Sequence, residues 1–160
     1  MSSTTIPGSV PSSRPSKLQA WIPTLLWLCT LAVFSSDLFS AEHTGKLLLR
    51  ILHWLGRASR AEFEWVHFFV RKTAHFCSYG LLSALAFISW RATFPALARW
   101  SFRWAGLALL LTLAAASADE FHQIFVSSRT GNANDVLLDM AGAAFFQLVI
   151  AIAISRRESA

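Results

Sequence analysis

The feature that most constrains this chain is a set of four long apolar runs, at residues 21–39, 73–90, 104–126 and 135–154. Each is long enough for an α-helix to cross the roughly 30 Å hydrocarbon core of a bilayer. Backbone N–H and C=O groups in lipid must bond within their own segment, so runs of this kind become helices. Only 14% of the residues are charged, against roughly 25% in soluble domains. The sequence therefore predicts an all-α membrane protein with four transmembrane helices.

The segments outside the runs complete the predicted domain organisation. Residues 1–20 are rich in Ser, Thr and Pro without a periodic apolar pattern, which is typical of a disordered tail. We expect one membrane domain over residues 21–155 and a short C-terminal tail at 156–160. A signal peptide is the alternative interpretation of the first run. That run is long for this role and lacks a good cleavage site after it, which favours a retained helix.

The connection between the first two runs has a pattern of its own. From residue 42 to Gly56, basic side chains recur every three to four positions, and leucine, isoleucine and tryptophan fill the rest. This pattern indicates an amphipathic helix in the membrane interface, or a helix packed over the mouth of the bundle. Ser59 and Glu62 match a capping box for a further helix, which continues through Trp65 and the following phenylalanines into the second run.

Strongly polar residues stand at one end of every run. Four antiparallel spans place the end of the first, the start of the second, the end of the third and the start of the fourth on one side. These places hold Ser35, Ser36, Asp37, Arg71, Lys72, His75, Asp119, Glu120, His122, Gln123, Asp135 and Asp139, and Arg129 lies in the loop that joins the last two. Ionisable groups at membrane depth are costly unless they pair or line a wet cavity. This end of the bundle is therefore the candidate site.

Helical spacing refines the cluster. Asp135 and Asp139 stand four residues apart on one helical face, and Gly142 continues that face. A glycine there would let a neighbouring helix approach closely. We also expect Glu120 to pair with a base from another helix, Lys72 first and Arg129 second, with His75 and Gln123 in the same network. The reason is that a lone desolvated carboxylate is costly.

The basic residues indicate a membrane surface and a topology. The net charge is +5, but the 14 Lys and Arg residues are spread over the connections and form no stripe, so we expect no nucleic-acid partner. With the N-terminus inside, these residues split evenly between the two sides. On the inner side they cluster around short loops, where the positive-inside rule works best. The expected orientation therefore has both termini in the cytoplasm and the polar end outside.

Three sequence blocks resemble the VanZ family. They are RKTAHFCSYG at 71–80, DEFHQIFVSSRTG at 119–131 and DVLLDMAGA at 135–143. That family is named for an accessory protein associated with resistance to the glycopeptide teicoplanin. The resemblance covers about residues 21–154 and implies a small multi-pass protein of the bacterial cytoplasmic membrane that acts at the cell envelope. It places the recurring polar positions of the family at Lys72, His75, Glu120, Gln123, Arg129 and Asp135.

Three functions remain open for this cluster. The first is binding of an anionic lipid-linked or wall-derived molecule, with Lys72 and Arg129 holding a phosphate or carboxylate. The second is a membrane-embedded hydrolase or transferase that uses His75 or Glu120 as acid or base. The third is a purely structural network that fixes the helices in register. The oligomeric state is open as well.

Cofactor chemistry finds less support. Neither an HExxH motif nor a cysteine pair nor a paired-histidine spacing is present. His75, His122, Glu120, Asp135 and Asp139 are the candidate ligands if a metal binds, but the expectation from the sequence is no metal and no cofactor.

Overall fold

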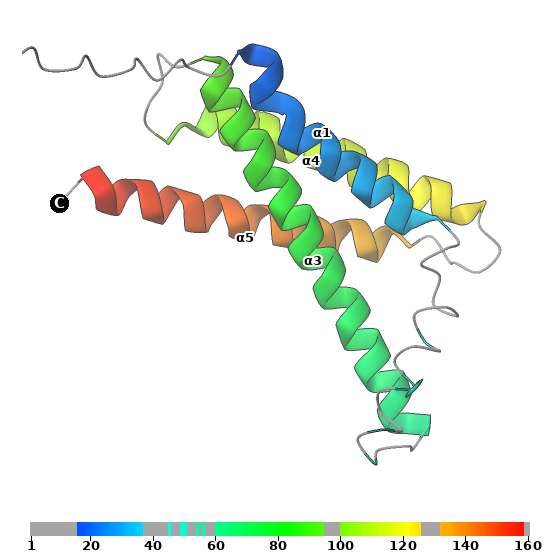
Figure 1. Cartoon of the computed structure of the whole chain (residues 1–160). Helices are drawn as coiled ribbons and strands as arrows, with labels where there is room; N and C mark the ends of the chain where they lie inside the picture. Colours follow the sequence, from blue (N-terminus) through cyan, green and yellow to red (C-terminus); the bar gives the residue numbers. More distant parts are fainter. Residues whose placement is uncertain are drawn as a thin grey trace, which may run out of the picture.

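The computed structural model describes residues 16–36, 60–94, 100–125 and 132–158, together with positions 45, 49, 50, 54 and 56. Four α-helices and no strand are seen in these ranges (Figure 1). They are α1 (Lys17–Ser35), α3 (Arg60–Thr93), α4 (Phe102–Ile124) and α5 (Ala133–Glu158). The all-α prediction is confirmed. The predicted amphipathic helix between residues 42 and 56 lies mostly outside the described residues.

Three of these helices, α1, α4 and α5, are long and apolar enough to cross a membrane. The fourth predicted span, residues 73–90, lies inside α3, which does not meet the same criterion of length and apolarity. His75, Ser83 and Ser89 are polar residues inside this stretch. It therefore stays a prediction that α3 crosses the bilayer.

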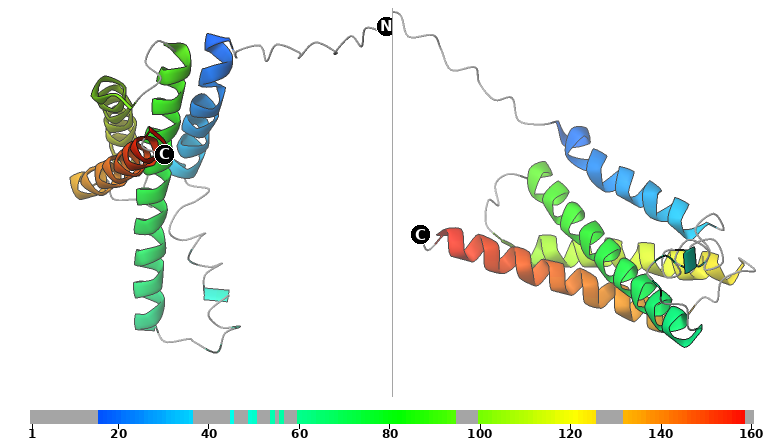
Figure 2. Two further views of the ribbon diagram at one scale, coloured as in Figure 1. Left: turned by 90° about the vertical axis from the view of Figure 1, so that its left-hand side faces the viewer. Right: turned by 60° about the horizontal axis from the view of Figure 1, so that its bottom comes forward.

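α3 is the central helix of the fold. It packs against α1, α4 and α5, and it runs between α1 on one side and the α4–α5 pair on the other (Figure 2, left). The sequence prediction that this helix continues from Trp65 through Phe69 into the second apolar run is confirmed. Its N-terminal part projects beyond the other helices (Figure 1), and Trp65, Phe68 and Phe69 are exposed there.

The first helix begins earlier than the apolar run suggests. Ser16 caps α1 through a capping box, because its hydroxyl accepts from the N–H of Gln19 while the Gln19 side chain accepts from the N–H of Ser16. α1 therefore starts at Lys17, inside the segment predicted to be a tail. Thr24 then bonds Ser89 across the α1–α3 interface at 2.8 Å, which satisfies two buried hydroxyls.

Close packing of α3 against α5 positions the polar end of the bundle. A Cβ atom added at Gly142 would lie 2.1 Å from the backbone carbonyl oxygen of Phe76, so only glycine fits at this crossing. On the other helix, a Cβ at Gly80 would lie 2.4 Å from the Phe146 ring. The prediction that Gly142 permits a close helix approach is confirmed. His75 is the residue before Phe76, and at this crossing its side chain lies next to Asp139 of α5.

Candidate functional site

Side chains from four helices gather at one end of the bundle, as the alternation of the spans predicts. The contacts that join them cross α3 to α5, α3 to α4 and α1 to α4. We call the following set the polar cluster: Lys72, His75, Tyr79, Asp119, Glu120, Gln123, Asp135 and Asp139. Asp37 and Arg129 lie outside the described residues.

The lysine of the cluster pairs with an aspartate at the start of α5. Lys72 Nζ contacts Asp135 Oδ1 in a partly buried ion pair. Glu120 instead accepts a hydrogen bond from the backbone N–H of Asn132, 2.7 Å from its Oε2 atom. The prediction that Glu120 pairs first with Lys72 is therefore wrong. A backbone donor just ahead of α5 takes the place of a basic side chain.

A second group of bonds joins α3 to α4. Tyr79 donates its hydroxyl to Asp119 Oδ2 at 2.9 Å, and Gln123 donates its amide to the same oxygen at 3.0 Å. Tyr79 and Gln123 are both buried. The predicted ligand-binding set omits Tyr79 and Asp119. Their signal in the sequence is spacing, since Asp119 precedes Gln123 by four residues and Tyr79 follows Lys72 by seven.

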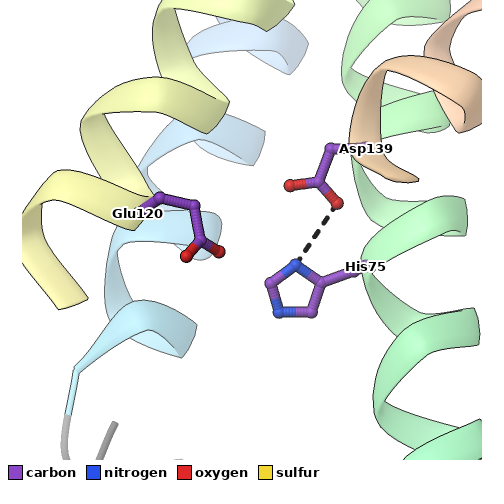
Figure 3. A group of neighbouring side chains, drawn as sticks. All are labelled: His75, Glu120 and Asp139. Carbon is purple, nitrogen blue, oxygen red and sulfur yellow. Dashed lines mark ion pairs between the residues drawn. The ribbon is translucent and has the colours of Figure 1, made fainter. Parts of the chain in front are cut away.

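The third group brings His75, Glu120 and Asp139 together from α3, α4 and α5 (Figure 3). One possible ligand atom from each residue lies within 4.8 Å of the others. His75 Nδ1 is 3.3 Å from Asp139 Oδ1, but neither atom makes a hydrogen bond of acceptable geometry. The two residues that the sequence marks as acid–base candidates, His75 and Glu120, are thus neighbours. Asp139, which is outside the predicted ligand-binding set, completes the group.

Beside the cluster, residues of α1, α3 and α4 line a half-open pocket of about 290 Å³. This volume is just below the roughly 300–1,000 Å³ that ligand pockets span. Its lining is apolar along α1 and α4 and polar toward the end of the bundle: Leu28, Leu31, Ala32, Ser35, Tyr79, Ala115, Ala118, Asp119 and His122. Tyr79 and Asp119 belong both to this lining and to the polar cluster. The pocket is therefore an apolar space that lies next to the ionisable groups of the polar cluster.

These features define a multi-pass helical membrane protein whose buried ionisable residues gather at one end of the helix bundle. The chain belongs to the VanZ/LLP1 family, whose model matches residues 20–154. The family predicted from the three sequence blocks is thereby confirmed. A search among curated proteins and a search among solved structures each gave no match.

Proposed function

We propose that this protein binds an anionic lipid-linked or wall-derived molecule of the bacterial cell envelope, with its headgroup at the polar cluster and its hydrocarbon chain in the pocket. The pocket carries the proposal because its lining changes from leucine and alanine to Tyr79, Asp119 and His122 toward one end. An amphiphile has the same change of polarity along its length. A chain segment, rather than a whole lipid, fits the observed volume.

A purely structural network accounts for only part of the cluster. It explains the Lys72–Asp135 ion pair and the bonds that Tyr79 and Gln123 make to Asp119. It leaves Asp139 buried without a hydrogen bond to either carboxylate oxygen, and Glu120 Oε1 is also without one. Buried polar atoms in a network that serves only stability are normally satisfied. These vacant acceptors favour a site that takes a ligand with hydroxyl or amide donors beside its anionic group.

The orientation and the biological setting are part of the same proposal. We place the polar end on the outer side of the cytoplasmic membrane, because the basic residues cluster around the short loops of the opposite side. The chain belongs to a family that is named for an accessory protein associated with teicoplanin resistance. This membership supports a role in the response to glycopeptides. Arg129, in the segment that connects α4 to α5 at this end, is the arginine we assign to the anionic group.

Filling the pocket tests this function. Ala115 lines the pocket, whereas Ala114, one residue earlier on α4, is exposed and does not. The full-length protein and the variants Ala115→Leu and Ala114→Leu are purified from membranes in mild detergent, and co-purified lipids are identified by mass spectrometry. We expect the parent and Ala114→Leu to retain a phosphate-headed lipid and Ala115→Leu to lose most of it.

The same three proteins give a readout in cells. Teicoplanin susceptibility is compared in cells that produce equal amounts of each, and we expect Ala115→Leu alone to behave like cells without the protein. Equal lipid retention in all three proteins would contradict the assignment of the pocket. Lost retention with unchanged susceptibility would refute the link to glycopeptides and leave lipid binding intact.

A further inference from the structure

Asp139 is a fully buried carboxylate with neither oxygen hydrogen-bonded in the described part of the protein. Its residue is 0% exposed, and neither Oδ1 nor Oδ2 has a hydrogen-bond partner there. Figure 3 shows its carboxylate directed into the space between α3 and α4, toward His75 and on the side where Glu120 lies. An isolated buried carboxylate is strongly unfavourable unless a charge or a coordinating ion compensates it.

Ion pairs and hydrogen bonds satisfy the four carboxylates of the polar cluster unequally. Of the four carboxylates in the polar cluster, Asp135 is neutralised by Lys72, and Asp119 accepts hydrogen bonds from two side chains. Glu120 and Asp139 remain, each with at least one carboxylate oxygen that accepts no hydrogen bond. These same two residues share the space with His75. The oxygens without hydrogen bonds therefore belong to a pair of carboxylates beside an imidazole.

We propose that His75, Glu120 and Asp139 bind a divalent transition-metal cation, Zn²⁺ or Mn²⁺, at the junction of α3, α4 and α5. One imidazole and two carboxylates suit these ions, whereas Mg²⁺ prefers ligand sets made of oxygen alone. Three protein ligands leave a coordination position open. A phosphate oxygen can take that position. The ion would then supply the positive charge that the proposed anionic headgroup needs.

The observed geometry is close to what such an ion requires. Ligand atoms about 2.1 Å from a tetrahedral ion lie roughly 3.4 Å apart, and His75 Nδ1 and Asp139 Oδ1 are 3.3 Å apart. All three ligand atoms lie within 4.8 Å of one another, so the side chains must move closer together to bind one ion. The N–H of Asn132 holds Oε2 of Glu120. That bond orients the carboxylate in the way that outer-shell partners orient metal ligands.

Metal content of the purified protein tests the proposal. The full chain is produced with an affinity tag that lacks histidine, treated with a chelator, and titrated with Zn²⁺ and with Mn²⁺ by calorimetry in detergent. We expect one ion per chain. Loss of an outer-shell partner typically weakens metal affinity 10–100-fold, so loss of a ligand in Asp139→Asn should weaken it by more than about 100-fold.

Asp119→Asn is the matched control, since it removes a neighbouring carboxylate whose oxygen already accepts bonds from Tyr79 and Gln123. It should change the affinity less than about 10-fold, below the range typical of an outer-shell partner, because the hydrogen bonds of Asp119 go to Tyr79 and Gln123 and not to the three proposed ligands. A second measurement on the parent protein avoids dependence on folded variants: bound Mn²⁺ gives an electron paramagnetic resonance spectrum that excess Zn²⁺ should abolish. Asp139→Asn and Glu120→Gln should show neither the spectrum of bound Mn²⁺ nor a change when Zn²⁺ is added.

Two results would overturn the metal site. The parent protein could bind no ion beyond the amount bound by Asp139→Asn, which would mean that protons or the ligand itself compensate the carboxylates. Alternatively, Asp119→Asn could lose the ion as completely as Asp139→Asn, which would place the ion elsewhere in the cluster. Neither result bears on lipid retention by the Ala115→Leu variant, so failure of this site and failure of the proposed function are distinguishable.

Discussion

Replacement of Gly142 by alanine tests whether the close α3–α5 crossing is what holds the polar cluster together. The added Cβ would lie 2.1 Å from the carbonyl oxygen, 2.9 Å from the carbonyl carbon and 3.0 Å from the Cα of Phe76. Carbon–oxygen contacts normally begin at about 3.3 Å, so the helices must separate by roughly 1 Å. No side-chain rotation relieves the contact, because all three atoms belong to the backbone.

The magnitude follows from two opposing effects. Overpacking that forces a backbone shift costs typically about 1–3 kcal/mol, and a backbone clash without a flexible partner belongs at the upper end. Alanine in place of glycine inside a helix returns about 1 kcal/mol. The net loss of unfolding free energy is then about 2 kcal/mol. For chains of about this length, 1 kcal/mol corresponds to about 2–4 °C in Tm, so Gly142→Ala should melt about 4–8 °C below the parent.

Gly106→Ala is the matched control. It is also a glycine inside a helix, but a Cβ there meets nothing within 4 Å. This variant should gain the helix-propensity effect alone and melt at or slightly above the parent temperature. Melting is followed by tryptophan fluorescence in detergent. Equal melting temperatures for Gly142→Ala and Gly106→Ala would refute the close crossing as the feature that positions His75 against Asp139.

Two further predictions concern charge and topology. Lys72→Met and Asp135→Asn should each lower Tm. The double variant should lose less stability than the sum of the two single variants, with a coupling energy of about 0.5–3 kcal/mol because the residues are in contact. Strictly additive losses would mean that the ion pair contributes nothing. A cysteine at Asn132, in a background without the native cysteines, should react with an impermeant thiol reagent on intact cells if the polar end faces out; reaction only after lysis would reverse the orientation.

Much of the architecture could be predicted from the sequence because bilayer thickness and chain alternation leave few choices. Four apolar runs of sufficient length, joined in series, place alternate ends together, and the structure brings Lys72, His75, Glu120 and Asp135 to one end. Glycine at position 142 could also be interpreted in advance, because it continues the face of two aspartates where a neighbouring helix must pass.

The pairing inside the cluster could not be predicted in the same way. Which acid meets Lys72 depends on how each helix is rotated about its axis, and the alternation of spans does not fix that rotation. Glu120 meets a backbone N–H at Asn132 instead of a basic side chain, and a backbone donor leaves no compositional signal. The group of His75, Glu120 and Asp139 combines three helices, so its members show no motif spacing along the chain.

The weak apolar character of α3 and its position in the bundle have a common cause. Its hydroxyls at Ser83 and Ser89 are buried, and they bond Gln147 of α5 and Thr24 of α1. Ile88 of the same helix is exposed where lipid would lie. These two serines of α3 thus face protein on both sides of the helix, while α1, α4 and α5 supply most of the exposed apolar residues. A helix of this kind is least costly in the bilayer when its neighbours satisfy its side chains. If α3 crosses the bilayer as predicted, the helix that carries Lys72, His75 and Tyr79 is therefore the one whose insertion depends most on the other three.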